Sequence, residues 1–199
     1  LDATLEGEEG DTGNAFASGD KISLNLPESQ QKLLDALVKT GKPLVTVVAA
    51  GSALNVPQGN AEIMAWYPGQ AGGTALAEIL FGEVNPSGRL PVTFYHDLSE
   101  LPEFTDYSMK NRYFEGKPLY PFGYGLSYTT FALDNEAVDA EMGWVTATVE
   151  NTGDRDGETV VQVYVQDVDT KWETLHPHLA GFARGAEGRR EAADCCSAG

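Results

Sequence analysis

Cysteine and basic side chains are both scarce in this 199-residue chain. Its two cysteines, Cys195 and Cys196, are adjacent, so they cannot join distant parts of a fold in the usual way and do not indicate a redox compartment. Lys and Arg number 13 against 30 Asp and Glu, which gives a formal net charge of -17. This charge argues against nucleic acid or an anionic membrane as a partner, because both require a basic face, and it is compatible with a neutral sugar.

Long apolar runs and metal-binding clusters are missing as well. No apolar stretch approaches the roughly 20 residues that a membrane-spanning helix needs, and nothing before Glu6 resembles a signal peptide. The histidines His96, His176 and His178 do not form a ligand set, so we expect no metal site. We expect no cofactor either, because the Gly-rich turn at residues 69–73 is not a complete phosphate-binding loop. Since the chain starts with Leu, we expect a fragment whose own N-terminus is missing, and its localisation stays open.

The first two thirds of the chain alternate between helical and strand patterns. Three leucines and Val38 at helical spacing between Pro27 and Gly41 predict an amphipathic helix, and a second helix is expected at residues 74–81. Strands are expected at residues 44–50, 61–67 and 90–95, and the almost wholly apolar run at 44–50 is typical of a strand buried on both faces. This order predicts an α/β fold, an open α/β sandwich with a mainly parallel sheet.

The last third has a different composition. Residues 144–150 and 158–166 read as strands, separated by a turn-rich connection at residues 151–157, and predict the start of an all-β sandwich. After Phe182 the alternation stops, and small and charged residues dominate. We therefore expect residues 183–199 to be an aberrant, disordered tail that follows a truncation or a reading-frame change.

Three short motifs carry a resemblance to a known family. They are LEGEE at Leu5–Glu9, NPSGRLPVTF at Asn85–Phe94 and YPFGYGLSYTTF at Tyr120–Phe131. In content and order they resemble the C-terminal half of family 3 glycoside hydrolases, the β-glucosidases and β-xylosidases. The resemblance implies a partial α/β sandwich domain at residues 1–128 and a partial fibronectin type III-like domain at residues 129–182. It also implies a partner outside this sequence, an N-terminal barrel domain of the same enzyme that carries an Asp nucleophile.

The acidic loop near the start of the chain contains the candidate catalytic residues. Glu6, Glu8, Glu9 and Asp11 crowd a Gly-flanked segment, where mutual repulsion favours protonation of one carboxylate. Without the family resemblance, an acidic loop of this kind is most often an exposed, solvated surface segment. The resemblance implies that Glu6 is the acid/base, with Glu8 as its competitor, and that Asp20 braces the loop. For Trp66 and Tyr67, we expect core packing rather than sugar stacking.

Two functions remain open at this point. The leading hypothesis, implied by the resemblance, is a C-terminal fragment of a retaining exo-β-glycosidase that acts on β-linked glucosides, xylosides or oligosaccharides. On that hypothesis the fragment contributes the acid/base loop and not the nucleophile. The alternative is a non-catalytic carbohydrate-binding or scaffold module that keeps the fold without the chemistry. The choice between glucose and xylose stays open, because the pocket for the terminal sugar is expected mostly on the barrel.

Overall fold

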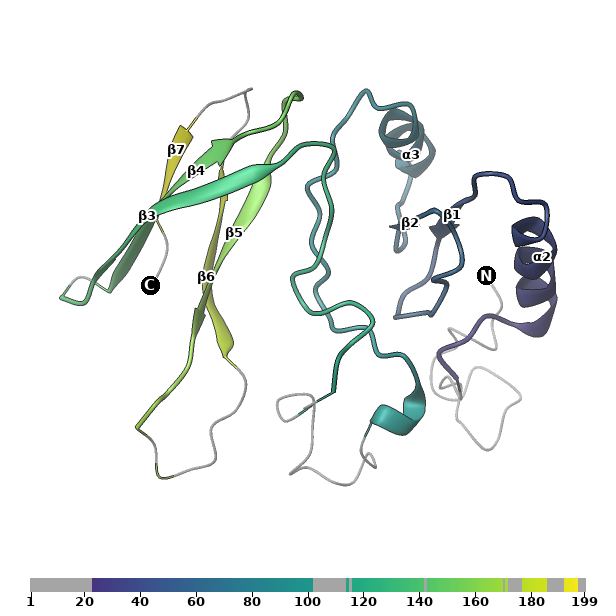
Figure 1. Ribbon diagram of the computed structural model, residues 1–199, viewed down its shortest axis with the longest axis horizontal. Helices are drawn as coiled ribbons and strands as arrows, with labels where there is room; N and C mark the ends of the chain where they lie inside the picture. Colours follow the sequence, from purple (N-terminus) through teal and green to yellow (C-terminus); the bar gives the residue numbers. More distant parts are fainter. Residues whose placement is uncertain are drawn as a thin grey trace. The chain divides into compact units, whose positions relative to one another are not determined.

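The computed structural model describes residues 23–101, 114, 116–141, 143–169, 171, 177–185 and 192–196 (Figure 1). The chain divides into two compact units. Among the described residues, the first unit contains 23–77, 92–101 and 116–121, and the second contains 78–91, 114 and those from 122 onward.

Helix α2 of the first unit spans Glu28–Val38, as the sequence predicts. Pro27 precedes it with a φ of -54°, close to the helical value, and the acidic Glu28 lies at the positive end of the helix dipole. The helix ends at Val38, and in the turn that follows Gly41 takes a φ of 66°, a conformation that glycine adopts without steric cost. Leu34 is the buried residue of the helix and points its side chain into the core.

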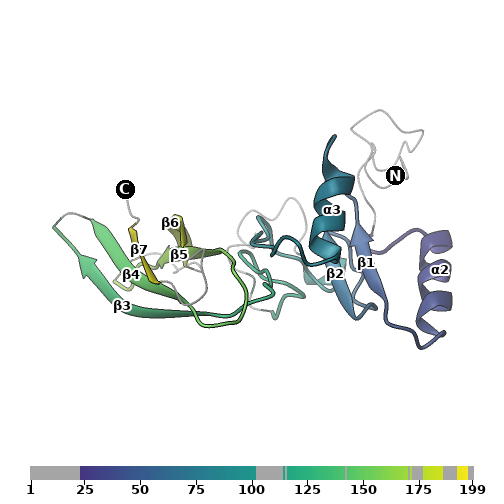
Figure 2. The same cartoon turned by 90° about the horizontal axis from the view of Figure 1, so that it is seen from above.

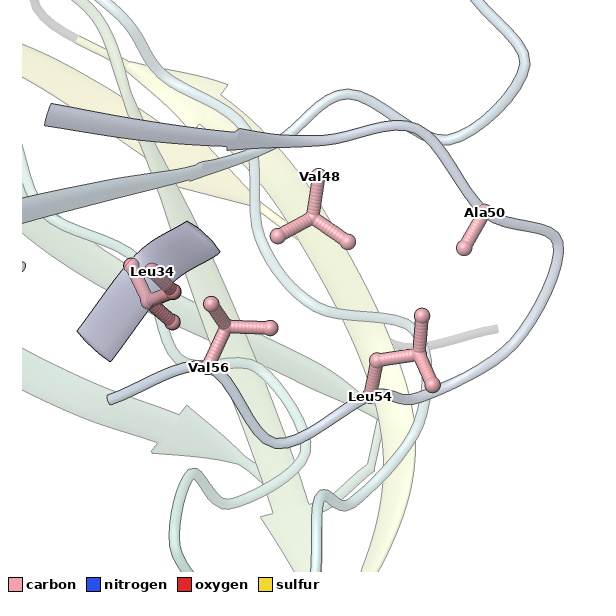
Figure 3. Packing of buried hydrophobic residues seen from close by; sticks show 5 residues of the cluster. All are labelled: Leu34, Val48, Ala50, Leu54 and Val56. Carbon is pink, nitrogen blue, oxygen red and sulfur yellow. The ribbon is translucent and has the colours of Figure 1, made fainter. Parts of the chain in front are cut away.

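Strands β1 (Val45–Val48) and β2 (Ala61–Met64) pair in parallel, with Val45 opposite Ala61 and Val48 opposite Met64. The core of the unit lies on one side of this pair, where Figure 3 shows the helix residue Leu34 close to Val56 and to Val48 of the strand. Its buried members are Leu34, Val48, Ala50, Leu54 and Val56.

The expectation that the first strand is buried on both faces is wrong. Val45 is 48% exposed and Val47 is 42% exposed, whereas Val48 is buried. Successive side chains of a strand point to opposite faces, so Val45 and Val47 share the face that α2 does not cover. An apolar run of β-branched residues is compatible with one or two covered faces, because its composition does not say how many layers pack on it.

The predicted strand at residues 90–95 does not form as a strand. Phe94 instead makes an isolated antiparallel bridge to Tyr120, with N to O distances of 2.8 and 3.2 Å. Two further elements complete this part of the chain: helix α3, Gly72–Leu80, agrees with the predicted second helix, and a short 3₁₀ helix, η1, spans Leu98–Glu100.

The second unit contains the remaining strands in two antiparallel sheets (Figure 2). One sheet has the order β3-β4-β7, and the other pairs β5 with β6. The sheets pack on each other through the fully buried Val149 of β4, which contacts Phe131, Val161 and Ala183 from three other strands. The strand bounds are β3 Phe131–Asp139, β4 Trp144–Asn151, β5 Thr159–Val165, β6 His178–Gly185 and β7 Ala192–Cys196.

Two of these strands extend into the segment for which the sequence predicts no regular structure. Strand β6 continues through Gly185, and the backbone of β7 pairs with β4 from Ala192 opposite Glu150 to Cys196 opposite Thr146. The expectation of a tail without strands after Phe182 is therefore wrong for these residues. An antiparallel ladder is made by backbone N–H and C=O groups, so a segment can join it without alternating apolar side chains.

Candidate functional site

The predicted catalytic residues Glu6 and Glu8 lie outside the described residues, and so does Asp20. Their roles therefore stay predictions. The described part of the chain contains other polar clusters, in both compact units.

In the first unit, Glu62 of β2 faces Tyr120. The Tyr120 hydroxyl donates a hydrogen bond of 3.2 Å to Glu62 Oε2. Burial raises the pKa of the Glu62 carboxyl, and the hydrogen bond from Tyr120 opposes that rise with a smaller effect. The neutral acid is therefore favoured over a wider pH range than in a solvated glutamate.

Tyr120 is also part of a series of aromatic contacts. Its ring packs edge-on against Phe94 at a centroid distance of 6.1 Å, and Phe94 packs edge-on against Trp66 at 6.3 Å. Trp66 is half-buried in this cluster, in agreement with the packing role expected for it, whereas Tyr67 is 55% exposed, against that expectation. Tyr120 connects this ring cluster to Glu62 through its hydroxyl.

The other carboxylate with a shifted pKa in this unit has a structural role. Asp97 precedes the short helix η1, and its side chain accepts a hydrogen bond of 2.8 Å from the backbone N–H of Ser99. That bond lowers the pKa of Asp97, because it stabilises the ionised form. The residue therefore serves as a helix cap.

In the second unit, polar groups line an open pocket of about 360 Å³ formed by Gly82, Glu83, Asn85, Arg155 and Asp156. Arg155 donates to the carbonyl of Gly82, and its guanidinium lies 5.4 Å from the centre of the Tyr128 ring. Both contacts are favourable for a cation, so the Arg155 guanidinium is positioned by Gly82 and Tyr128. No group of three or more His, Cys, Asp or Glu among the described residues could hold a metal ion.

Sequence reasoning did not single out Glu62 or Asn85. A signal for Glu62 was present, because a carboxylate interrupts the otherwise apolar run at residues 61–67. For Asn85 the signal was weaker, since asparagine before proline is common in ordinary turns. The partners of both residues are 42 to 71 positions away in the sequence, which local patterns do not reveal.

The described residues include no helix that is both long and apolar enough to cross a membrane.

Comparison with known proteins identifies the class. Residues 2–128 match the model of the glycosyl hydrolase family 3 C-terminal domain. This match covers more than half of the chain, so the chain belongs to glycosyl hydrolase family 3, as the sequence motifs predict.

Curated relatives and solved structures agree with this assignment. The chain is 43% identical to a xylan 1,4-beta-xylosidase of Xylanibacter ruminicola, over 91% of this chain and 22% of that protein. It is 38% identical to a periplasmic beta-glucosidase of Salmonella typhimurium, over 86% of this chain and 26% of that protein. A GH3 beta-glucosidase from Bifidobacterium adolescentis superposes with a TM-score of 0.82 at 33% identity, over 94% of this chain and 31% of that one. The chain thus spans about a quarter of the length of these curated relatives.

Proposed function

We propose that this chain is the C-terminal part of a retaining exo-β-glycosidase that removes terminal β-D-glucosyl or β-D-xylosyl residues. The observation that carries the proposal is the family match over residues 2–128, together with relatives named as a xylosidase and a glucosidase at 43% and 38% identity. These relatives differ in the sugar that their names specify, so the proposal covers both substrates. The substrate-binding barrel and the nucleophile belong to a segment outside this sequence.

In this proposal, Glu6 is the acid/base and Glu8 is its competitor. Retaining hydrolysis uses two carboxyl groups about 5 Å apart, one of which attacks the anomeric carbon while the other protonates the leaving oxygen. After the leaving group departs, the second carboxylate takes a proton from water. The water then attacks the glycosyl-enzyme, which releases the sugar and frees the nucleophile. The crowded carboxylates at residues 6–11 support this role, because like charges raise the pKa of one member of such a group.

The strands of the second unit are proposed to be a fibronectin type III-like domain. Two antiparallel sheets that pack through Val149 support this assignment, since sheet-on-sheet packing is the basis of β-sandwich folds. The domain limits expected from the sequence are 1–128 and 129–182. Because β6 reaches Gly185 and β7 spans Ala192–Cys196, we propose that the second domain continues past Phe182.

The assignment of Glu6 is tested in the full-length enzyme with Glu6→Ala and Glu8→Ala, using Glu9→Ala as the matched control from the same loop. We expect Glu6→Ala to lower turnover of glycosides with poor leaving groups by roughly 10²–10⁴-fold and to affect activated aryl glycosides far less, because only the former need a proton in the transition state. Azide added to the Glu6→Ala variant should partly restore turnover, because it attacks the glycosyl-enzyme without base assistance and gives a β-glycosyl azide.

Two results would change the proposal. Leaving-group dependence and azide rescue in the Glu8 variant alone would transfer the acid/base role to Glu8. A full-length protein that binds β-linked oligosaccharides without any turnover would support the non-catalytic module instead. The 199-residue chain alone should not hydrolyse aryl β-glucosides or β-xylosides, since it lacks the proposed covalent route.

A further inference from the structure

Three sequence segments of the second unit meet at the side chain of Asn85. They are the loop that contains Asn85 itself, the segment with Ser127 and Tyr128, and the turn with Asp156 that connects β4 to β5. The first two belong to the motifs on which the family resemblance is based. Their meeting point suggests a role for these motifs other than contact with a sugar.

Asn85 uses both ends of its amide. Its Oδ1 accepts hydrogen bonds from Ser127 Oγ at 2.9 Å and from the backbone N–H of Tyr128 at 2.8 Å. Its Nδ2 donates to the backbone carbonyl of Asp156 at 3.0 Å. A backbone N–H can only donate and a carbonyl can only accept, so these partners define the orientation of the amide. An aspartate has no donor for the Asp156 carbonyl, and an alanine has neither group.

Close backbone approach accompanies these bonds. A Cβ atom added to Gly157 would overlap Asn85 Nδ2, and one added to Gly125 would overlap the carbonyl oxygen of Gly88. Glycine is therefore required at both positions, because the Asn85 loop approaches the backbone of the two segments that contain Gly125 and Gly157.

Arg89 makes a second connection between the same loop and the strands. Its Nη2 donates to Thr159 Oγ1 of β5 at 2.8 Å, while its Nη1 donates to the carbonyls of Ser87 and Gly88. Arg89 is half-buried, and this burial lowers the pKa of its guanidinium. The polar groups of the Asn85–Arg89 run thus have partners within the second unit.

We propose that Asn85 is a latch that ties the loop at residues 82–91 to the strands of the second unit, so that the loop and the strands open as one cooperative element. The NPSGR run then serves the assembly of this unit. The proposal is independent of the proposed enzymatic activity, because every partner belongs to the same unit and none is an expected catalytic residue.

Hydrogen exchange of the full 199-residue chain tests the latch in wild type and in Asn85→Asp. The variant keeps the shape and both acceptor contacts and loses the donor to Asp156. We expect exchange of the Tyr128 amide and of the β4 and β5 amides to accelerate together, by roughly 2- to 10-fold, because loss of this hydrogen bond from the half-buried Asn85 to the exposed Asp156 lowers the free energy of opening of the whole cooperative element.

Asn60→Asp is the matched control. It makes the same chemical change in the first unit, where Asn60 Oδ1 accepts from the backbone N–H of Leu44 at 2.8 Å and so uses the oxygen that aspartate retains. We expect β4 and β5 exchange to be unchanged in this control. Ser127→Ala, which removes one donor to Asn85 Oδ1, gives a milder version of the Asn85 test if Asn85→Asp fails to fold, with the same joint acceleration expected.

The latch would be refuted if exchange accelerates only at residues 82–88 while β4 and β5 keep wild-type rates, because Asn85 would then brace its own turn alone. Equal exchange profiles for Asn85→Asp and Asn60→Asp would refute it as well.

Discussion

Replacement of Asn151 by alanine should be among the most destabilising single changes in the second unit. Asn151 is the last residue of β4, and its side chain is 0% exposed. Its Oδ1 accepts from Thr129 Oγ1 at 2.7 Å and from the backbone N–H of Gly153 at 3.2 Å, and its Nδ2 donates to the carbonyl of Arg155 at 2.9 Å. The side chain therefore holds the turn after β4 from the inside.

The size of the effect follows from these three contacts. A hydrogen bond contributes about 1 kcal/mol net, and more when its loss leaves a buried partner unsatisfied. Thr129 is buried, whereas the turn residues Gly153 and Arg155 can recover part of their loss from water. We therefore expect Asn151→Ala to lower the free energy of unfolding of this unit by about 3 kcal/mol. This is a large share of the 5–15 kcal/mol that is typical of a domain.

Urea unfolding followed by circular dichroism measures this change, with hydrogen exchange of β4 peptides to assign the transition. At typical denaturant dependences, about 3 kcal/mol moves the midpoint by roughly 1–3 M urea. Thr130→Ala is the matched control, because Thr130 and Thr152, the neighbours of Thr129 and Asn151 in the sequence, form an exposed hydroxyl pair at 2.9 Å. We expect that control to change stability by less than about 0.5 kcal/mol.

A loss below about 1 kcal/mol for Asn151→Ala would refute the reasoning, and so would a loss equal to that of the exposed control. The double variant with Thr129→Ala adds an independent check. The two changes should be less than additive by about 1 kcal/mol, because each removes the same 2.7 Å hydrogen bond.

Further predictions concern the core, a glycine and a carboxyl. Val149→Ala should cost about 2 kcal/mol in urea unfolding, from about 0.8 kcal/mol per lost methyl group plus a cavity, and a cost equal to that of the 75% exposed Val138→Ala would contradict this. Gly157→Ala should lower the unfolding midpoint clearly more than Gly88→Ala, since only the former adds a Cβ that overlaps a neighbour. The raised pKa of Glu62 means that its contribution to stability is fully present below its ordinary pKa of 4.5 and is lost as the pH rises through the folded value. Glu62→Gln should remove this loss of stability when the free energy of unfolding is measured against pH. The control Glu150→Gln, which changes an exposed carboxyl, should keep it.

The local elements could be predicted from the sequence. Helix α2 was recognisable because its apolar spacing, the preceding Pro27 and the terminal Gly41 all lie within one short stretch. Helix α3 was recognisable for the same reason, with bounds that differ by one or two residues from those expected. The family was also readable, because its motifs are contiguous runs that need no knowledge of the fold.

The candidate sites divide in the same way. Glu6 and Glu8 came from a contiguous motif, so the sequence alone nominated them. Asn85 and Asn151 could not be nominated, since what distinguishes each is burial or a partner far along the chain. For Glu62 the sequence offered only a carboxylate within an apolar run, and its partner Tyr120 became visible in the fold. A side chain acquires these properties only when distant segments meet.

Tertiary structure alone decided how many layers cover each strand and which segments pair. Val45 and Val47 have the composition of buried residues, yet their face of β1 is exposed because α2 and the loop after β1 pack on the other side. Phe94 makes only a bridge to Tyr120, since a strand exists where a partner extends the ladder and not where propensity is high. The backbone of β7 shows the converse, because pairing with β4 makes a strand of residues whose pattern does not predict one.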